Sequence, residues 1–229
     1  TIENGIDISK YNLRLANFSK KERIITMVAG FREAKDQDTL IRAMSLLSND
    51  YKLWLVGDGE RREILENLVV ELKLSDRVKF WGICSDVPQR LEGSHIVVLS
   101  SHWEGFGLAA VEAMASGRPV IASNVDGLRE IVGGHGFLFP HKDYVTLANE
   151  IKSLCDNNDR HSQVAKQCQE RAKQFDKTKI RVALNVLFLL LAAIGLAMYF
   201  FFDTNNVTAL LVIAFGMLFK VVEFILRLF

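Results

Sequence analysis

Short apolar runs that alternate with helical patterns constrain the fold of the first 181 residues. These runs lie at 24–29, 53–56, 78–81, 96–99, 120–122 and 136–139. Strands this apolar are buried on both faces, which requires helices on both sides of a parallel sheet. The sequence therefore predicts an α/β domain with a doubly wound parallel sheet of the Rossmann-like kind.

Polar segments follow the ends of these runs. Residues 30–35, 57–59, 82–85 and 100–107 come directly after predicted strands and are rich in glycine, hydroxyl groups and charge. A doubly wound sheet binds its ligands beyond the carboxyl ends of its strands. We therefore expect the functional site at this edge of the sheet.

The turn after the first run carries Gly30, Arg32 and Lys35. It lacks the Gly-x-Gly-x-x-Gly that a nicotinamide dinucleotide requires, and the chain has no kinase-type phosphate loop. Cations at this turn, with glycine-rich turns at helix starts, suit a diphosphate held by side chains and a helix N-terminus.

The segment 102–112 reads His-Trp-Glu-Gly-Phe-Gly-Leu-Ala-Ala-Val-Glu and places two glutamates eight residues apart. Glu104 precedes the glycines, and Glu112 lies two turns into a predicted helix, about 12 Å along its axis. This separation suits two ends of one ligand better than a paired acid and base. Carboxylates also accept hydrogen bonds from sugar hydroxyls. Taken alone, the pattern equally fits an N-terminal acidic residue and a solvated helical glutamate.

Several motifs in a fixed order resemble the C-terminal, donor-binding domain of retaining GT-B glycosyltransferases of family 4, the glycosyl transferases group 1 type. Beside 102–112 they are 3–7, 28–35, 56–59, 78–82, 117–123 and 126–132. The resemblance covers roughly residues 2–175. It implies an interdomain hinge at 1–18 and a nucleotide-sugar-binding domain at 19–178.

The resemblance also implies roles for matching residues. Glu104 would contact hydroxyls of the transferred sugar, Glu112 the ribose, and Lys35 the phosphate, so that Glu104 and Lys35 are the candidate catalytic residues. The backbone that would approach the sugar and the diphosphate belongs to Gly105, Phe106, Gly107 and Leu108.

One donor-site position departs from the family pattern. Gly30 stands where many members have arginine, and the nearest arginine is Arg32. Either Arg32 reaches the diphosphate from a shifted position, or phosphate binding is weaker in this chain. The resemblance implies a UDP- or GDP-linked sugar as donor and no metal or other cofactor.

Other polar residues suggest sites that we expect to be structural. Asp36-Gln37-Asp38 spells the metal-binding Asp-x-Asp of other glycosyltransferases, yet it opens a predicted helix, where aspartates cap amides. His95 starts a buried strand and is predicted to pack in the core. His102 either contacts the ligand or is solvated.

The three cysteines have no metal-ligand spacing. Cys84 follows a predicted strand, and Cys155 and Cys168 lie in helical patterns. We expect reduced thiols rather than a disulfide or a zinc site. The formal net charge is +1, and no nucleic-acid partner is expected.

The chain beyond Arg181 differs from the part before it, because charge is almost absent. The runs 182–202 and 207–228 have the length of spanning helices, which take about 20 apolar residues. A polar turn at 203–206 separates them. The sequence predicts a transmembrane helical hairpin over 182–229, with a soluble helical hairpin as the alternative.

Flanking charge orients this predicted hairpin. Lys173, Lys177, Lys179 and Arg181 precede the first run, and the turn between the runs carries no cation. The positive-inside rule then places both ends in the cytoplasm. A membrane protein with its donor domain on the cytoplasmic face is expected.

Three functions remain open from the sequence. The chain could be the donor half of a hexosyltransferase-like, retaining enzyme of cell-surface or lipid-linked glycan synthesis. Because Thr1 opens at the hinge, we expect a fragment, processed product or partial chain whose acceptor domain lies elsewhere or on a partner chain. The alternatives are a membrane-tethered nucleotide-sugar binding module without turnover, and a fusion or interaction protein whose hairpin carries the function.

Overall fold

The structure is a computed structural model that describes residues 5–11, 18, 21–201 and 206–228. The side chains of 177–181, 198–201, 206–210 and 225–228 lie outside this description. The chain divides into two compact units, Thr1–Phe175 and Asp176–Phe229. Each unit is described by itself.

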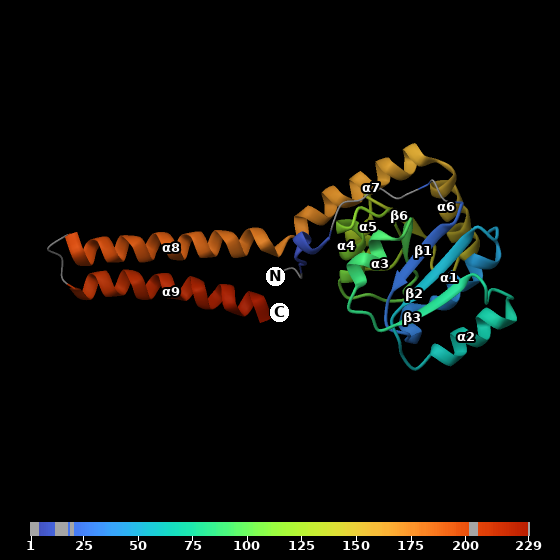
Figure 1. The fold of residues 1–229 in the computed structure, drawn as a ribbon, viewed down its shortest axis with the longest axis horizontal. Helices are drawn as coiled ribbons and strands as arrows, with labels where there is room; N and C mark the ends of the chain where they lie inside the picture. Colours follow the sequence, from blue (N-terminus) through green and yellow to red (C-terminus); the bar gives the residue numbers. More distant parts are fainter. Residues whose placement is uncertain (1–4, 12–17, 19–20, 202–205, 229) are drawn as a thin grey trace. The chain divides into compact units, whose positions relative to one another are not determined.

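The first unit is built on a six-stranded sheet with the order β3-β2-β1-β4-β5-β6 (Figure 1). The strands are β1 (Arg23–Val28), β2 (Tyr51–Val56), β3 (Val78–Gly82), β4 (Ile96–Leu99), β5 (Val120–Ser123) and β6 (Phe137–Phe139). Every pair of neighbouring strands is parallel. The predicted parallel α/β sheet is confirmed. Its order reverses between β1 and β4, and this switch point is where such sheets bind ligands.

Helices connect the strands and cover the sheet. They are α1 (Gln37–Ser45), α2 (Arg62–Glu71), α3 (Val87–Glu92), α4 (Leu108–Ala115), α5 (Leu128–Val132), α6 (Tyr144–Asp156) and α7 (Asn158–Ala172). Short 3-10 turns are η1 (Ile8–Lys10), η2 (Glu33–Lys35) and η3 (Lys173–Phe175). All residues of β4 and β5 are buried, as expected of strands covered on both faces.

Side-chain caps begin three of these helices. Asp36 accepts a hydrogen bond from the Thr39 amide at the start of α1, as the helix-opening interpretation of this aspartate predicted. Asp143 caps α6 and Asn157 caps α7 in the same way. Each cap satisfies an amide that has no partner within its helix.

The turns after β1 and β2 pack closely against each other. Gly57 has a φ of 139°, and a Cβ at this position would lie 2.0 Å from the Ala29 carbonyl oxygen. Only glycine allows the two backbones to approach this closely. The glycine after β2 therefore helps to shape the edge of the sheet where the ligand site was predicted.

The second unit is a pair of helices, α8 (Lys177–Phe201) and α9 (Asn206–Leu228), which cover the described residues of the two predicted apolar runs. The end of the first run and most of the predicted polar turn, at 202–205, lie outside the described residues. A membrane-spanning helix takes about 20 consecutive apolar residues. Within the described part of the chain, no helix is both long and apolar enough to cross a membrane. The transmembrane spans predicted at 182–202 and 207–228 are therefore not supported by the structure.

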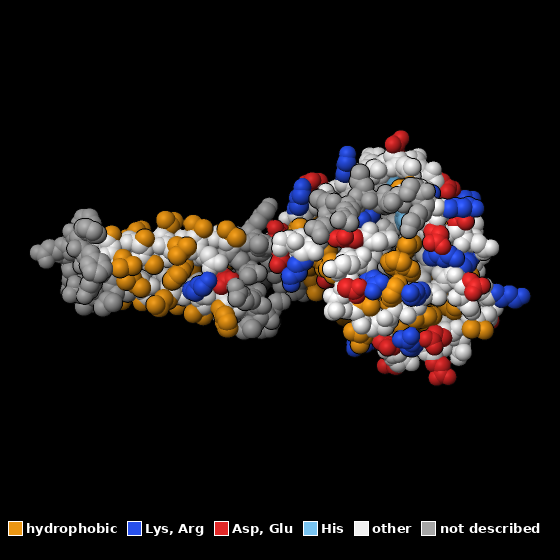
Figure 2. Space-filling view, viewed as in Figure 1, with side chains coloured by type: hydrophobic (Ala, Val, Ile, Leu, Met, Phe, Trp, Pro, Cys, Tyr) orange, Lys and Arg blue, Asp and Glu red, His pale blue; other side chains and the backbone are white. Residues whose placement is uncertain are grey.

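Polar groups and glycines lie between α8 and α9. The Lys220 ammonium donates to Asn185 Oδ1 at 2.6 Å and pairs with Glu223 at 3.2 Å, joining residues of both helices. Gly195 and Gly216 are buried, whereas many leucines and phenylalanines of this unit are exposed. Hydrophobic side chains accordingly cover much of the viewed face of α8 and α9 (Figure 2).

Candidate functional site

Two loops meet at the switch point of the sheet and bring the predicted catalytic residues together. Lys35 belongs to η2 after β1, and Glu104 lies in the loop after β4. The Lys35 ammonium donates to Glu104 Oε2 at 2.6 Å, and the Ser101 hydroxyl donates to the same oxygen at 3.2 Å. Both charged side chains are mostly buried. The carboxyl edge of the sheet thus carries a partly buried ion pair between residues 69 positions apart.

Hydrogen bonds between the loops hold this pair in place. The Ser100 hydroxyl donates to the Asp36 carbonyl oxygen at 2.6 Å, and the His102 amide donates to the Ala34 carbonyl oxygen at 2.8 Å. These bonds flank Lys35 on one loop and precede Glu104 on the other. The distance between the two charges is therefore set by backbone contacts as well as by their own attraction.

The loop that carries Glu104 rests against the turn before α5. Gly127 has a φ of 66°, and a Cβ there would lie 2.4 Å from the Glu104 carbonyl oxygen. A side chain at residue 127 would therefore push the loop away. This glycine belongs to one of the motifs that carried the family resemblance.

Residues 105–108 form the end of this loop and the start of α4. Gly107 has a φ of 81° and is the N-cap of α4, so it supplies no side-chain oxygen to the first helical amides. Phe106 packs against Phe175, with ring centroids 5.5 Å apart. Gly105 and Leu108 are exposed. The first amides of α4 can bind an anion, because a helix N-terminus carries partial positive charge.

Glu112 lies on α4 and receives a hydrogen bond from Tyr11. Burial raises the pKa of the Glu112 carboxyl, and the bond from Tyr11 partly opposes that shift. Burial and the nearby Glu112 raise the pKa of the tyrosine. Sequence reasoning missed Tyr11, because a residue 101 positions away gives no local signal of this contact.

Gly30 and Arg32 lie at the start of the first loop, where the sequence predicted binding of a diphosphate. Arg32 is exposed, and Gly30 accepts hydrogen bonds from the Arg32 amide at 2.9 Å and the Gln37 side chain at 3.0 Å. A Cβ at Gly30 would meet no atom closer than 3.7 Å, so this glycine is not required by packing. Binding of a diphosphate by Arg32 stays a prediction.

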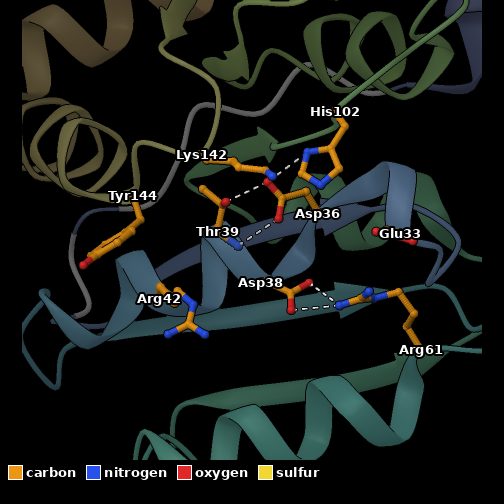
Figure 3. Close-up of a pocket in the computed structure, with 9 residues that line it drawn as sticks. All are labelled: Glu33, Asp36, Asp38, Thr39, Arg42, Arg61, His102, Lys142 and Tyr144. Atoms are coloured by element: carbon orange, nitrogen blue, oxygen red, sulfur yellow. Dashed lines mark hydrogen bonds and ion pairs between the residues drawn. The ribbon is translucent and has the colours of Figure 1, made fainter.

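A polar pocket of about 340 Å³, shown in Figure 3, is lined by neither Lys35 nor Glu104. Its lining residues are Glu33, Asp36, Asp38, Thr39, Arg42, Arg61, His102, Lys142 and Tyr144. Asp38 forms two hydrogen bonds with Arg61, at 2.9 and 2.8 Å. His102 Nδ1 lies 3.4 Å from Asp36 Oδ2 and also contacts His141 Nε2. Sequence reasoning found neither this pocket nor His141.

The remaining histidine and cysteine predictions concern packing. His95 is buried, and its Nδ1 accepts from the Ile24 amide at 3.0 Å, which confirms a packed histidine. All three cysteines are free, as predicted. Burial raises the pKa of Cys155 and of Cys168 to about 12, so both stay protonated thiols at neutral pH.

A parallel doubly wound sheet with a lysine, a glutamate and a helix N-terminus at its switch point belongs to the class of α/β domain that binds ligands beyond the carboxyl ends of its strands. Residues 12–175 match the family described as glycosyl transferases group 1. The protein belongs to this family, and the predicted GT-B type of domain is confirmed.

Individual relatives agree with this assignment. N-acetyl-alpha-D-glucosaminyl L-malate synthase of Bacillus anthracis is 32% identical over 167 residues, which are 71% of this chain and 44% of that protein. The UDP-Gal:alpha-D-GlcNAc-diphosphoundecaprenol alpha-1,3-galactosyltransferase of Escherichia coli is 30% identical over 173 residues, 68% of this chain and 45% of that protein.

Among solved structures, Anabaena HepE in complex with UDP-glucose is similar with a TM-score of 0.69 and 29% sequence identity. The likeness covers 75% of this chain and 52% of that chain. The chain spans about half, or less, of the length of the curated relatives it matches. The similarity is therefore to one part of these proteins.

Proposed function

We propose that this chain is the donor-binding part of a retaining glycosyltransferase, which moves a sugar from a UDP- or GDP-linked donor to an acceptor hydroxyl. The observation that carries the proposal is the ion pair between Lys35 and Glu104 at the switch point of a group 1 domain. The complex of HepE with UDP-glucose supports a nucleotide sugar as the ligand.

Lys35 and Glu104 would each contact a different part of the bound donor. The Lys35 ammonium would turn to the diphosphate and stabilise the negative charge that develops on the leaving group. The Glu104 carboxylate, released from Lys35, would accept hydrogen bonds from sugar hydroxyls. The first amides of α4 would bind a phosphate oxygen, so the proposed chemistry needs no metal ion for this charge.

Glu112 would bind the ribose of the same donor. Its carboxylate already accepts a hydrogen bond from the Tyr11 hydroxyl. A ribose hydroxyl offers the same kind of donor and would share or take over this acceptor. Glu104 and Glu112 would then hold opposite ends of one ligand.

The acceptor is a proposal drawn from relatives. The Escherichia coli relative is named for a sugar on diphosphoundecaprenol, and the Bacillus anthracis relative is named for malate. A lipid-linked or cell-surface glycan is therefore one candidate acceptor for this chain. It would bind to a second domain or to a partner chain that supplies the other wall of the cleft.

Calorimetry with UDP, GDP and UDP-glucose tests the donor site directly. We expect at least one of these ligands to bind, and we expect Lys35→Ala to weaken that binding by about 1.5–3 kcal/mol, the usual effect of removing a charged hydrogen-bond partner. Lys166→Ala, which removes an exposed lysine on α7, is the matched control and should bind as the parent chain does. A folded chain that binds none of the three ligands would contradict the proposal.

A radiolabelled-donor assay separates an enzyme from a binding module. The chain alone should transfer little sugar, because positioning both reactants can supply about 7–11 kcal/mol of barrier lowering and the acceptor wall belongs to another domain. Adding an acceptor-binding half should restore transfer, and Glu104→Gln should then remove most of it. Donor binding without restored transfer would favour a nucleotide-sugar binding module.

A further inference from the structure

Three metal-binding side chains converge outside the proposed donor site. Asp36, His102 and His141 each offer one ligand atom, and these atoms all lie within 4.8 Å of one another. They come from the loops after β1, β4 and β6, which meet at the carboxyl edge of the sheet. Two of the three, Asp36 and His102, also line the polar pocket, and Figure 3 shows His102 turned toward Asp36.

The hydrogen bonds among these three side chains cannot give every one of the facing atoms its own donor or acceptor. His102 Nδ1 faces both Asp36 Oδ2 and His141 Nε2. A neutral imidazole carries a proton on one nitrogen only. If that proton lies on His102 Nδ1, two acceptors share it; if it lies on His141 Nε2, a lone pair of His102 faces the carboxylate. A cation at the centre would satisfy all three atoms at once.

The distance between His102 Nδ1 and Asp36 Oδ2 fits two ligands of one metal ion. Two ligand atoms about 2.0–2.1 Å from a tetrahedral zinc ion lie about 3.3–3.4 Å apart. His102 Nδ1 and Asp36 Oδ2 are separated by 3.4 Å. His141 is closer than this to His102, but its side chain is exposed and has room to move outward.

The carboxylate of Asp36 can still bind a metal ion while it caps α1. The two oxygens of Asp36 accept from the Thr39 amide at 3.3 Å and the Thr39 hydroxyl at 2.6 Å, so a carboxylate lone pair remains for a metal. The other aspartate of the pocket, Asp38, is engaged by Arg61. Glu33, Arg42 and Lys142 line the same pocket, so it holds one further carboxylate and two further cations.

We propose that Asp36, His102 and His141 bind a divalent transition metal ion of the zinc type, with the fourth position open to water. Three protein ligands and one open position are a common zinc arrangement. The ion would tie together three loops, including the one that leads from His102 to Glu104. The proposal does not rest on sugar transfer, because the site shares no residue with the Lys35–Glu104 pair.

Metal titration of the whole chain tests this site. Calorimetry with Zn²⁺ and visible absorption with Co²⁺ as a spectroscopic probe should each show one bound ion per chain. His102→Gln and His141→Gln should each weaken binding at least about tenfold, since even residues behind the ligands change metal affinity by 10–100-fold. Asp36→Asn keeps an oxygen for the Thr39 amide and tests the carboxylate with the helix cap preserved.

Matched variants exclude other sources of metal binding. His135→Gln changes a partly buried histidine on another loop and should leave the titration unchanged. Cys84→Ser should also leave it unchanged, because Cys84 is the one cysteine of the three that is not buried. Far-UV circular dichroism shows whether each variant folds. The proposal is overturned if neither ion binds, if affinity survives His141→Gln in a folded chain, or if it disappears with Cys84→Ser.

Discussion

The two units of this chain bury opposite kinds of residue. In the α/β unit the buried positions are mostly aliphatic, as at Leu53, which is fully buried in β2. Among the described side chains of α8 and α9, the buried residues are Gly195, Gly216 and Glu223. Leucines of the same helices are exposed; Leu189 is 63% exposed.

This contrast shows that apolar composition does not by itself produce an apolar core. A sheet covered by helices removes aliphatic side chains from water on both faces. Two helices alone present one narrow face to each other, and here that face holds small residues and a polar group. The first unit is therefore stabilised by burial of aliphatic side chains. The described interface of the second unit is held by close contact at glycine and by the hydrogen bond from Lys220 to Asn185, and Glu223 pairs with Lys220 within α9.

The largest expected effect comes from the same substitution in both units. Leu53→Ala should cost about 2–5 kcal/mol of stability, because it leaves a cavity in the core. Leu189→Ala should change stability by no more than about 0.5 kcal/mol, because its side chain is exposed. Urea unfolding followed by tryptophan fluorescence reports the first unit, which holds all three tryptophans. Circular dichroism reports the helices of both units. Equal losses of stability in the two variants would contradict the expected difference between the units.

A second pair of variants compares two glycines at close contacts. Gly127→Ala should cost more than about 2 kcal/mol, because a left-handed conformation strains alanine and the new Cβ would lie 2.4 Å from the Glu104 carbonyl oxygen. It should also weaken nucleotide binding, since Glu104 would move.

Gly216→Ala should change stability by no more than about 1 kcal/mol. Alanine favours a helix over glycine by about that amount, and the new Cβ would meet Leu191 Cβ at 3.2 Å, so the two effects oppose each other. Chemical denaturation of both variants, with calorimetry for ligand binding, measures the difference. A larger loss at Gly216 than at Gly127 would show that the helix pair is packed more tightly than the site loop.

The smallest expected effect concerns two glutamates, Glu112 on α4 and Glu223 on α9. Because burial raises the pKa of Glu112, its stabilising contribution is fully present below its usual pKa of 4.5 and is lost as the pH rises through the folded-state pKa. At neutral pH its charge therefore costs stability. Glu112→Gln keeps an acceptor for Tyr11 and should slightly raise the urea midpoint at pH 7, while weakening nucleotide binding.

Below pH 4.5 the same variant should show no gain in midpoint, and Glu63→Gln on the exposed face of α2 is the control at both pH values. Glu223→Gln should instead slightly lower the stability of the helix pair, because it removes the charge that pairs with Lys220 at 3.2 Å. A gain for Glu112→Gln that did not depend on pH would rule out ionisation as its cause.

The sequence by itself determined the architecture of the first unit and the edge at which its site lies. Apolar runs and helical periodicity are local signals, and burial on both faces requires a parallel sheet covered by helices. The motifs around Lys35 and Glu104 then indicated the family. The same hydropathy also indicated two helices at the C-terminus. The membrane spans predicted from it are not supported, because no helix in the described part of the chain is long and apolar enough to cross a membrane.

Tertiary structure alone decided which side chains meet. The Lys35–Glu104 ion pair, the Tyr11–Glu112 hydrogen bond and the cluster of Asp36, His102 and His141 join residues on separate segments of the chain. Hydrophobic periodicity in the sequence does not indicate such contacts, because they depend on loop conformation and on close backbone approaches such as that at Gly127. The sequence located the edge of the sheet, and packing of the loops placed each charge on it.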